Sequence, residues 1–149
     1  MATLSFLTWD TARWCALILM LSIAAAWDVR QRRIPNALTL TGALAGLLLG
    51  AGQPGWMLSL LGGMVAFSFF MVLHRMGWIG AGDVKLAAAA GVYFSPSQAL
   101  HACLLILLAG GVLAALWAQL PRTSIRHDLP YGVAIALGAG YQAWQVSAL

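Results

Sequence analysis

The sequence predicts an all-α, polytopic membrane protein with six transmembrane helices. Hydrophobic residues make up 62% of the 149 residues and charged residues only 8%, whereas a soluble domain carries about 25% charged residues. In addition, short runs rich in Gly, Pro, Ser and Asn divide the chain into six apolar segments. A helix needs about 20 apolar residues to cross the hydrocarbon core of a bilayer. We therefore expect one membrane-embedded domain over residues 1–149.

Polar breaks separate the first three expected helices. Residues 11–27 are apolar and precede a run of arginines. We expect this segment to be retained rather than cleaved as a secretory signal, because only Arg13 supplies a basic charge ahead of its apolar part. Residues 37–51 follow a proline and an asparagine, and residues 56–73 follow the Gly- and Pro-containing run 52–55.

The last three expected helices are delimited in the same way. Residues 83–94 follow two glycines and form a short, alanine-rich segment. Residues 97–119 follow a Ser-Pro-Ser break, and residues 131–146 follow a polar stretch that ends at Pro130.

The basic residues indicate the orientation of the helices. Six helices place seven of the eight basic residues on one face, which the positive-inside rule makes cytoplasmic. We therefore expect a multi-pass protein of the inner (cytoplasmic) membrane with both termini outside, and arginines that contact anionic lipid headgroups rather than nucleic acid. For the arginines after the first helix, pairing with an acidic group of a substrate stays an alternative. The seven basic residues on the expected cytoplasmic face are Arg30, Arg32, Arg33, Arg75, Lys85, Arg122 and Arg126.

Acidic residues are rare in this chain. It has four, Asp10, Asp28, Asp83 and Asp128, and no Glu. Ionisable side chains beside transmembrane helices are costly and usually functional. The topology places Asp28 at the end of the first helix and Asp83 at the start of the fourth, on the same face. Asp128 lies in a loop on that face and is a rival acid, whereas Asp10 lies on the opposite face.

Two neighbouring carboxyl groups point to acid–base chemistry. Such a pair shares a proton, so that one group accepts a proton from water and the other donates to a peptide carbonyl, without metal or cofactor. Gly80 and Gly82 beside Asp83 would allow unusual backbone angles and close approach of a substrate chain. Three alternatives stay open: a helix-capping role for Asp83, a transporter or proton channel that uses both acids as carriers, and a non-catalytic assembly protein.

Three strings in the sequence resemble elements of type IV prepilin peptidases. They are Asp28-Val-Arg-Gln-Arg-Arg-Ile-Pro-Asn36, Gly80-Ala-Gly-Asp-Val-Lys-Leu86 and Pro130-Tyr131-Gly132. The resemblance implies a membrane aspartic endopeptidase that removes the basic leader from membrane-inserted prepilin or pseudopilin precursors, after a glycine at the cytoplasmic face. It implies a catalytic pair of Asp28 and Asp83. Active-site loop positions would be Gly80, Gly82, Lys85, Pro35, Asn36, Pro130, Tyr131 and Gly132.

One departure from the longer family members concerns cysteine. Their paired Cys-x-x-Cys motifs are lacking, and Cys15 and Cys103 lie singly in apolar runs, which excludes a zinc ribbon. The sequence is similar to the short, peptidase-only members of tight-adherence (Flp) pilus systems, so we expect no methyltransferase activity. Archaeal preflagellin peptidases are the alternative within the same class of enzyme.

Three further features carry expectations of position. Asn36 is expected to cap the second helix or to orient the backbone near Asp28. Lys85 follows Asp83 by two residues, so it points away from that carboxylate on a helix and extends toward the membrane surface. The small-residue ridge of Gly42, Gly46 and Gly50 indicates close helix packing, with a homodimer interface as the alternative.

Overall fold

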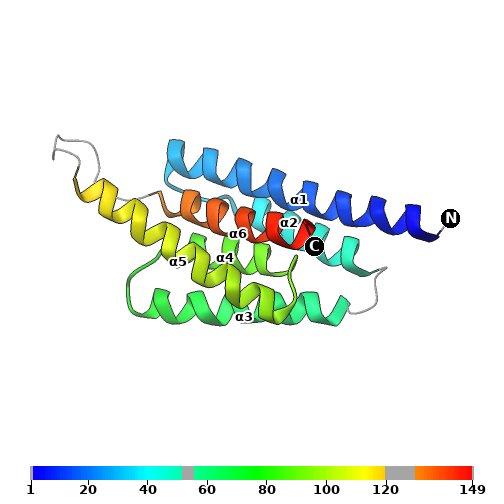
Figure 1. The fold of residues 1–149 in the computed structure, drawn as a ribbon. Coiled ribbons are helices and arrows are strands. Elements are labelled where there is room, and N and C mark those ends of the chain that lie inside the picture. Colours follow the sequence, from blue (N-terminus) through cyan, green and yellow to red (C-terminus); the bar gives the residue numbers. More distant parts are fainter. Residues whose placement is uncertain (1, 52–55, 120–129, 149) are drawn as a thin grey trace.

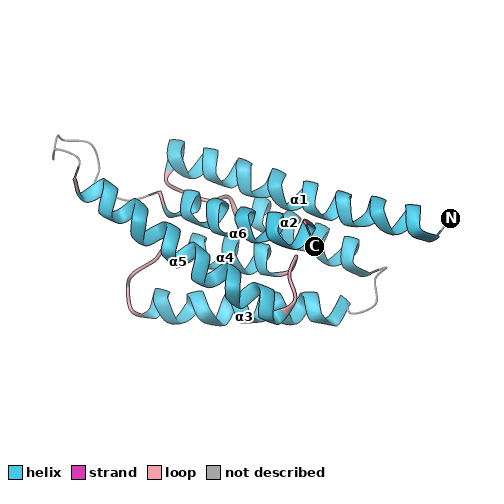
Figure 2. Ribbon diagram, in the orientation of Figure 1, coloured by secondary structure: helices cyan, strands magenta, loops and turns pink. Residues whose placement is uncertain are grey.

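The computed structural model describes residues 2–51, 56–119 and 130–148. Within these ranges the regular secondary structure is entirely α-helical (Figure 2), which confirms the prediction of an all-α fold. The described helices are α1 (Ala2–Gln31), α2 (Asn36–Ala51), α3 (Trp56–Arg75), α4 (Ala81–Gly91), α5 (Pro96–Ala118) and α6 (Tyr131–Ser147).

The helices run along one long axis and alternate in direction (Figure 1). α1 and α3 lie on opposite sides of the bundle, and α2, α4 and α6 lie between them. The C-terminal ends of α1, α3 and α5 therefore lie toward the same end of the bundle as the N-terminal ends of α2, α4 and α6. This end carries Asp28 and Asp83, and we call it the aspartate end.

Three helices are long and apolar enough to cross a membrane. They are α1 over Asp10–Gln31, α3 over Trp56–Arg75 and α5 over Pro96–Ala118. The chain is thus a multi-pass membrane protein. α4 has 11 residues and covers only about 16 Å, roughly half of the hydrocarbon thickness. The full count of six transmembrane helices stays a prediction.

Three helix boundaries differ by three or more residues from those expected from the sequence, the first being the start of α1, which lies at Ala2 instead of residue 11. α1 continues to Gln31, so Asp28 lies within its last turn rather than after it. α4 ends at Gly91, three residues earlier than expected, because the backbone tightens there into turns. The amide of Tyr93 donates to the carbonyl of Ala90, and that of Phe94 to Gly91, at 3.0 and 3.1 Å.

The glycine ridge of α2 packs within the chain. Gly42, Gly46 and Gly50 are all buried. The Tyr93 hydroxyl donates to the carbonyl of Gly42 at 2.8 Å, and a Cβ on Gly46 would lie 2.8 Å from Cε2 of the Tyr93 ring. The ridge therefore serves helix packing inside one molecule, the first of the two alternatives.

Arg13 joins three helices at the end of the bundle opposite the aspartate end. Its Nη2 donates to Ser59 Oγ of α3 at 2.8 Å and to the carbonyl of Val92, just after α4, at 3.2 Å. Carbonyl groups at the end of a helix have no partner within the helix, so this contact satisfies one of them. α4 is thereby held at its C-terminal end by α1.

Candidate active site

Asp28 is a buried carboxylate in the last turn of α1. Its side chain is only 7% exposed, and Oδ2 accepts a hydrogen bond of 2.8 Å from the amide of Gly132. Gly132 belongs to the first turn of α6, where backbone N–H groups lack partners within the helix. The positive end of the α6 dipole also favours a negative charge at this position. The structure thus brings together two of the predicted site residues.

Gly132 is the residue that permits this contact. A Cβ at this position would lie 2.9 Å from Asp28 Oδ2 and 3.0 Å from Asp28 Cβ. Any larger residue would push the start of α6 away from α1 or turn the carboxylate. Glycine is required at position 132 for the close approach of α6 to Asp28 and not for its backbone conformation, because Gly77 is the only described glycine with a positive φ.

Asp83 lies in the first turn of α4. Its Oδ2 accepts a hydrogen bond of 3.1 Å from the amide of Gly80, which caps the helix as the sequence allowed. Gly80 has φ −74° and ψ 154°, values that any residue can adopt. The expectation that Gly80 and Gly82 are needed for unusual backbone angles is therefore wrong. A Cβ on Gly82 would make ordinary contact with Ile34 at 3.6 Å.

Both carboxyl groups line one pocket with a volume of about 890 Å³. The pocket lies at the aspartate end, and the ends of α1 and α5, the connection between α3 and α4, and the starts of α4 and α6 supply its wall. The lining residues that bear on its chemistry are Asp28, Arg32, Trp78, Gly80, Asp83, Gly110, Gly111 and Tyr131. Asp83 thus caps α4 through its bond with the Gly80 amide and also lines the pocket.

The surroundings raise the pKa of Asp83 to about 6. Burial of the carboxyl group is the largest cause, and the nearby charge of Asp28 adds to it, while the hydrogen bond from Gly80 opposes it. Asp83 lies at the start of α4, outside the three helices long enough to span the membrane. A carboxyl group with such a pKa exchanges its proton close to neutral pH, as general acid–base chemistry requires.

Tyr131 closes one side of the pocket against α5. A Cβ on Gly110 would lie 2.6 Å from Cε2 of the Tyr131 ring, so the glycine lets the ring approach the helix closely. The neighbouring Gly111 has no heavy atom within 4 Å of an added Cβ, which leaves open space in front of it. The glycine pair on α5 therefore shapes the pocket.

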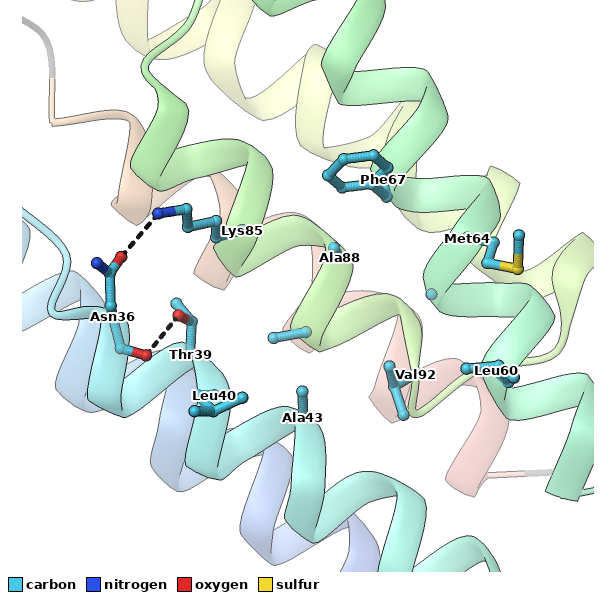
Figure 3. A pocket seen from close by; sticks show the side chains of 12 residues that line it. Asn36, Thr39, Leu40, Ala43, Leu60, Met64, Phe67, Lys85, Ala88 and Val92 are labelled. Atoms are coloured by element: carbon cyan, nitrogen blue, oxygen red, sulfur yellow. Dashed lines mark hydrogen bonds between the residues drawn. The ribbon is translucent and has the colours of Figure 1, made fainter.

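Lys85 and Asn36 lie outside this pocket. Lys85 Nζ donates to Asn36 Oδ1 at 2.9 Å and so links α4 to α2 (Figure 3). The Asn36 side-chain oxygen thus pairs with the lysine. The expectation that it caps α2 is wrong. Lys85 is exposed and points away from Asp83, in agreement with its expected direction.

The Lys85–Asn36 pair lies at one end of an apolar groove between α2, α3 and α4 (Figure 3). The groove has a volume of about 490 Å³. Leu40, Met64 and Phe67 line its walls, and all three are exposed. The predicted site residues are therefore divided between two hollows on different sides of α4.

The remaining predicted positions are placed as follows. The carbonyl of Pro35 accepts hydrogen bonds from the amides of Leu38 and Thr39 at 3.1 and 3.3 Å, so Pro35 directly precedes α2 and joins its first turn. Pro130 directly precedes α6 and is buried. The rival acid Asp128 lies outside the described residues.

Comparison with known proteins gives the family. Residues 15–118 match the model of the type IV leader peptidase family. The chain belongs to this family. It is 30% identical over 126 residues to the prepilin leader peptidase/N-methyltransferase of Bacillus subtilis (strain 168), covering 82% of this chain and 51% of that protein.

Two further relatives carry the same name. The protein of Myxococcus xanthus (strain DK1622) is 28% identical over 139 residues, which cover 84% of this chain and 42% of the relative. That of Pectobacterium carotovorum subsp. carotovorum is 29% identical over 140 residues, covering 85% and 50%. The chain thus spans about half the length of these relatives. No solved structure matches it significantly.

Sequence reasoning missed several residues of the pocket that holds both aspartates. Gly110 and Gly111 stand as a Gly-Gly pair inside an apolar helix, a signal that could have marked a close contact. Trp78 carries no such signal in the sequence. Arg32 was grouped with its neighbours as a membrane anchor, although it alone of the three arginines lines the pocket.

Replacement of Asp28 by Asn should lower the pKa of Asp83, because the charge of Asp28 contributes to raising it. The pKa should stay above the ordinary value, since burial is the larger cause. Infrared titration of the carboxyl C=O band measures the pKa of Asp83, and the Asp83→Asn variant assigns the band. Asp10→Asn, about 27 Å away along α1, is the control. An unchanged titration in Asp28→Asn would show that the two carboxyl groups do not interact.

Replacement of Gly132 by Ala should reduce peptidase activity about 100-fold, since displacing a reactive group by about 1 Å has an effect of that order. The added methyl would collide with Asp28, 2.9 Å from Oδ2. Gly140 lies on the same helix, and a Cβ at this position would have no heavy atom within 4 Å. Gly140→Ala is therefore the matched control. Equal rates for the two variants would contradict the role given to the Gly132–Asp28 contact.

Proposed function

We propose that this chain is a membrane aspartic endopeptidase that removes the basic leader from membrane-inserted type IV prepilin or pseudopilin precursors. Asp28 and Asp83 form its catalytic pair. The observation that carries the proposal is that these two carboxyl groups, from helices far apart in the sequence, line one pocket. Membership of the type IV leader peptidase family supports the substrate class.

The proposed reaction is hydrolysis by an activated water. The ionised carboxylate takes a proton from water as the oxygen bonds to the peptide carbonyl carbon, and the protonated partner donates to the carbonyl oxygen. The C–N bond then breaks as the leaving nitrogen takes up a proton from the pair, and one hydroxyl of the tetrahedral intermediate returns a proton to the pair as the C=O bond re-forms. The raised pKa of Asp83 supports one proton being shared near neutral pH, and that proton belongs to the pair rather than to a fixed residue.

The arrangement of charge supports a cytoplasmic active site. Of the six described Lys and Arg residues, Arg13 lies toward the opposite end of the bundle. The other five lie at or beside the end of α1, the end of α3 and the start of α4, which meet at the aspartate end: Arg30, Arg32, Arg33, Arg75 and Lys85. The positive-inside rule assigns such an end to the cytoplasm. We place the enzyme in the inner membrane with both termini on the other side.

The chain is further proposed to leave the new N-terminus unmethylated. Its two cysteines are single and separate, one of them buried, so they offer no paired Cys-x-x-Cys motif. The mass of the product from the assay below reports this directly: a gain of one methyl group in the presence of S-adenosylmethionine would contradict the proposal.

Both aspartates should be indispensable for cleavage. Co-expression with the prepilin of the same host, followed by a gel shift and N-terminal sequencing, should show cleavage after a glycine by the wild-type protein. Asp28→Asn and Asp83→Asn should each lose at least about 1,000-fold, because each removes a proton-transfer partner. Asp128→Asn is the control acid and should still cut. Wild-type rates in either of the first two variants would overturn the two-aspartate mechanism.

Filling the open space of the pocket should block cleavage without harming the fold. Gly111→Leu places a side chain into the space that lines the pocket, where nothing lies within 4 Å. We expect unchanged thermal stability and a loss of cleavage of at least about ten-fold, through KM, because the substrate chain loses its room. Gly140→Leu makes the same change in open space away from the pocket. If both variants cut alike, the substrate binds elsewhere.

A further inference from the structure

Three arginines follow Asp28 within five residues, and the structure separates them. Arg30 and Arg33 are exposed, whereas Arg32 is partly buried and lines the same pocket as Asp28 and Asp83. A lipid-anchoring role suits the first two. It does not account for an arginine that lines the pocket of both aspartates.

The backbone of Arg32 is also unusual. It has φ +53° and is the only residue other than glycine with a positive φ in the described part of the chain. This conformation costs free energy for a residue with a Cβ, and such strain gathers at functional sites. The amide of Arg32 donates to the carbonyl of Asp28 at 2.9 Å, so the turn that sets its direction is built on the aspartate itself.

The guanidinium has donor capacity to spare. It lies over the ring of Trp117 on α5, with Cζ 5.9 Å from the ring centroid. Nη1 is buried and has no hydrogen-bond partner among the described residues. A buried donor without an acceptor is unfavourable, so a ligand oxygen that reached Nη1 would relieve this cost.

We propose that Arg32 is a substrate-positioning residue whose guanidinium donates to a main-chain carbonyl oxygen of the precursor segment next to the cut bond. This inference rests on the proposed peptidase function. The two aspartates mainly accept hydrogen bonds, whereas an extended peptide also presents carbonyl oxygens that need donors. Among the described residues, Arg32 is the one cation that lines the pocket, and its charge excludes the basic side chains of the leader as its ligand.

The test separates the side chain of Arg32 from its strained backbone. Arg32→Gly accepts a positive φ freely and removes the whole side chain, including its contact with Trp117. Relief of the backbone strain offsets this loss, so the thermal stability should stay close to that of the wild type. Its kcat/KM for a purified precursor should still fall at least about ten-fold, mainly through KM. Arg32→Lys keeps the charge and should recover part of the loss. Arg33→Gly, at an exposed neighbour, should stay within about two-fold of the wild type.

Binding is measured separately in a protein that cannot cut. In an Asp83→Asn background, Arg32→Gly should weaken precursor binding about ten-fold, measured by fluorescence anisotropy in detergent. The loss should be the same for a precursor whose Asp and Glu residues are all replaced by amides. A loss confined to the acidic precursor would overturn the carbonyl assignment in favour of a substrate carboxylate.

The outcomes distinguish this inference from the function on which it rests. Normal cleavage and binding by Arg32→Gly, with Asp28→Asn and Asp83→Asn inactive, would reject the role of Arg32 and leave the peptidase in place. Absence of cleavage by the wild-type protein would reject the proposed function itself.

Discussion

The buried carboxylate of Asp28 is the constraint on which the arrangement of the helices at the pocket depends. A side chain that is 7% exposed at the end of a largely apolar helix loses most of its hydration, and that loss is unfavourable unless hydrogen-bond donors replace water. The amide of Gly132 supplies one at 2.8 Å. α6 must therefore begin beside the last turn of α1, and it does so with a proline, which has no N–H to leave unpaired, and a glycine that permits the contact.

α4 depends on a second set of contacts at its other end. A helix of 11 residues is too short to span the membrane, so its length does not determine its depth. Its position depends on the contacts at its C-terminal end. Arg13 holds the carbonyl of Val92, and the Tyr93 hydroxyl holds that of Gly42. α1 thus carries Asp28 at one end and the support of α4 at the other, which couples the two aspartates through a single rigid helix.

The features that the sequence predicts well are those determined by apolar length and by charge. Six apolar segments and the placement of seven basic residues predict which helix ends meet, and hence that Asp28 and Asp83 lie at the same end. The contact between Lys85 and Asn36, 49 residues apart, has no such signal because it depends on the rotation of packed helices. The ordinary φ of Gly80 and the positive φ of Arg32 were missed for a similar reason, since a turn can place strain at a residue other than glycine.

The two hollows on either side of α4 explain why Asp83 and Lys85 stand two residues apart. Successive residues of a helix are about 100° apart around its axis, so this spacing directs the two side chains about 200° apart. Asp83 then faces the pocket with Asp28, while Lys85 reaches Asn36 across the apolar groove. Rotation of α4 that moved Asp83 out of its pocket would also break the bond to α2. The buried apolar residues of α4 set its rotation, and the Lys85–Asn36 bond is consistent with that rotation. The string Gly80–Leu86 thus carries both the carboxylate and a contact that supports its direction.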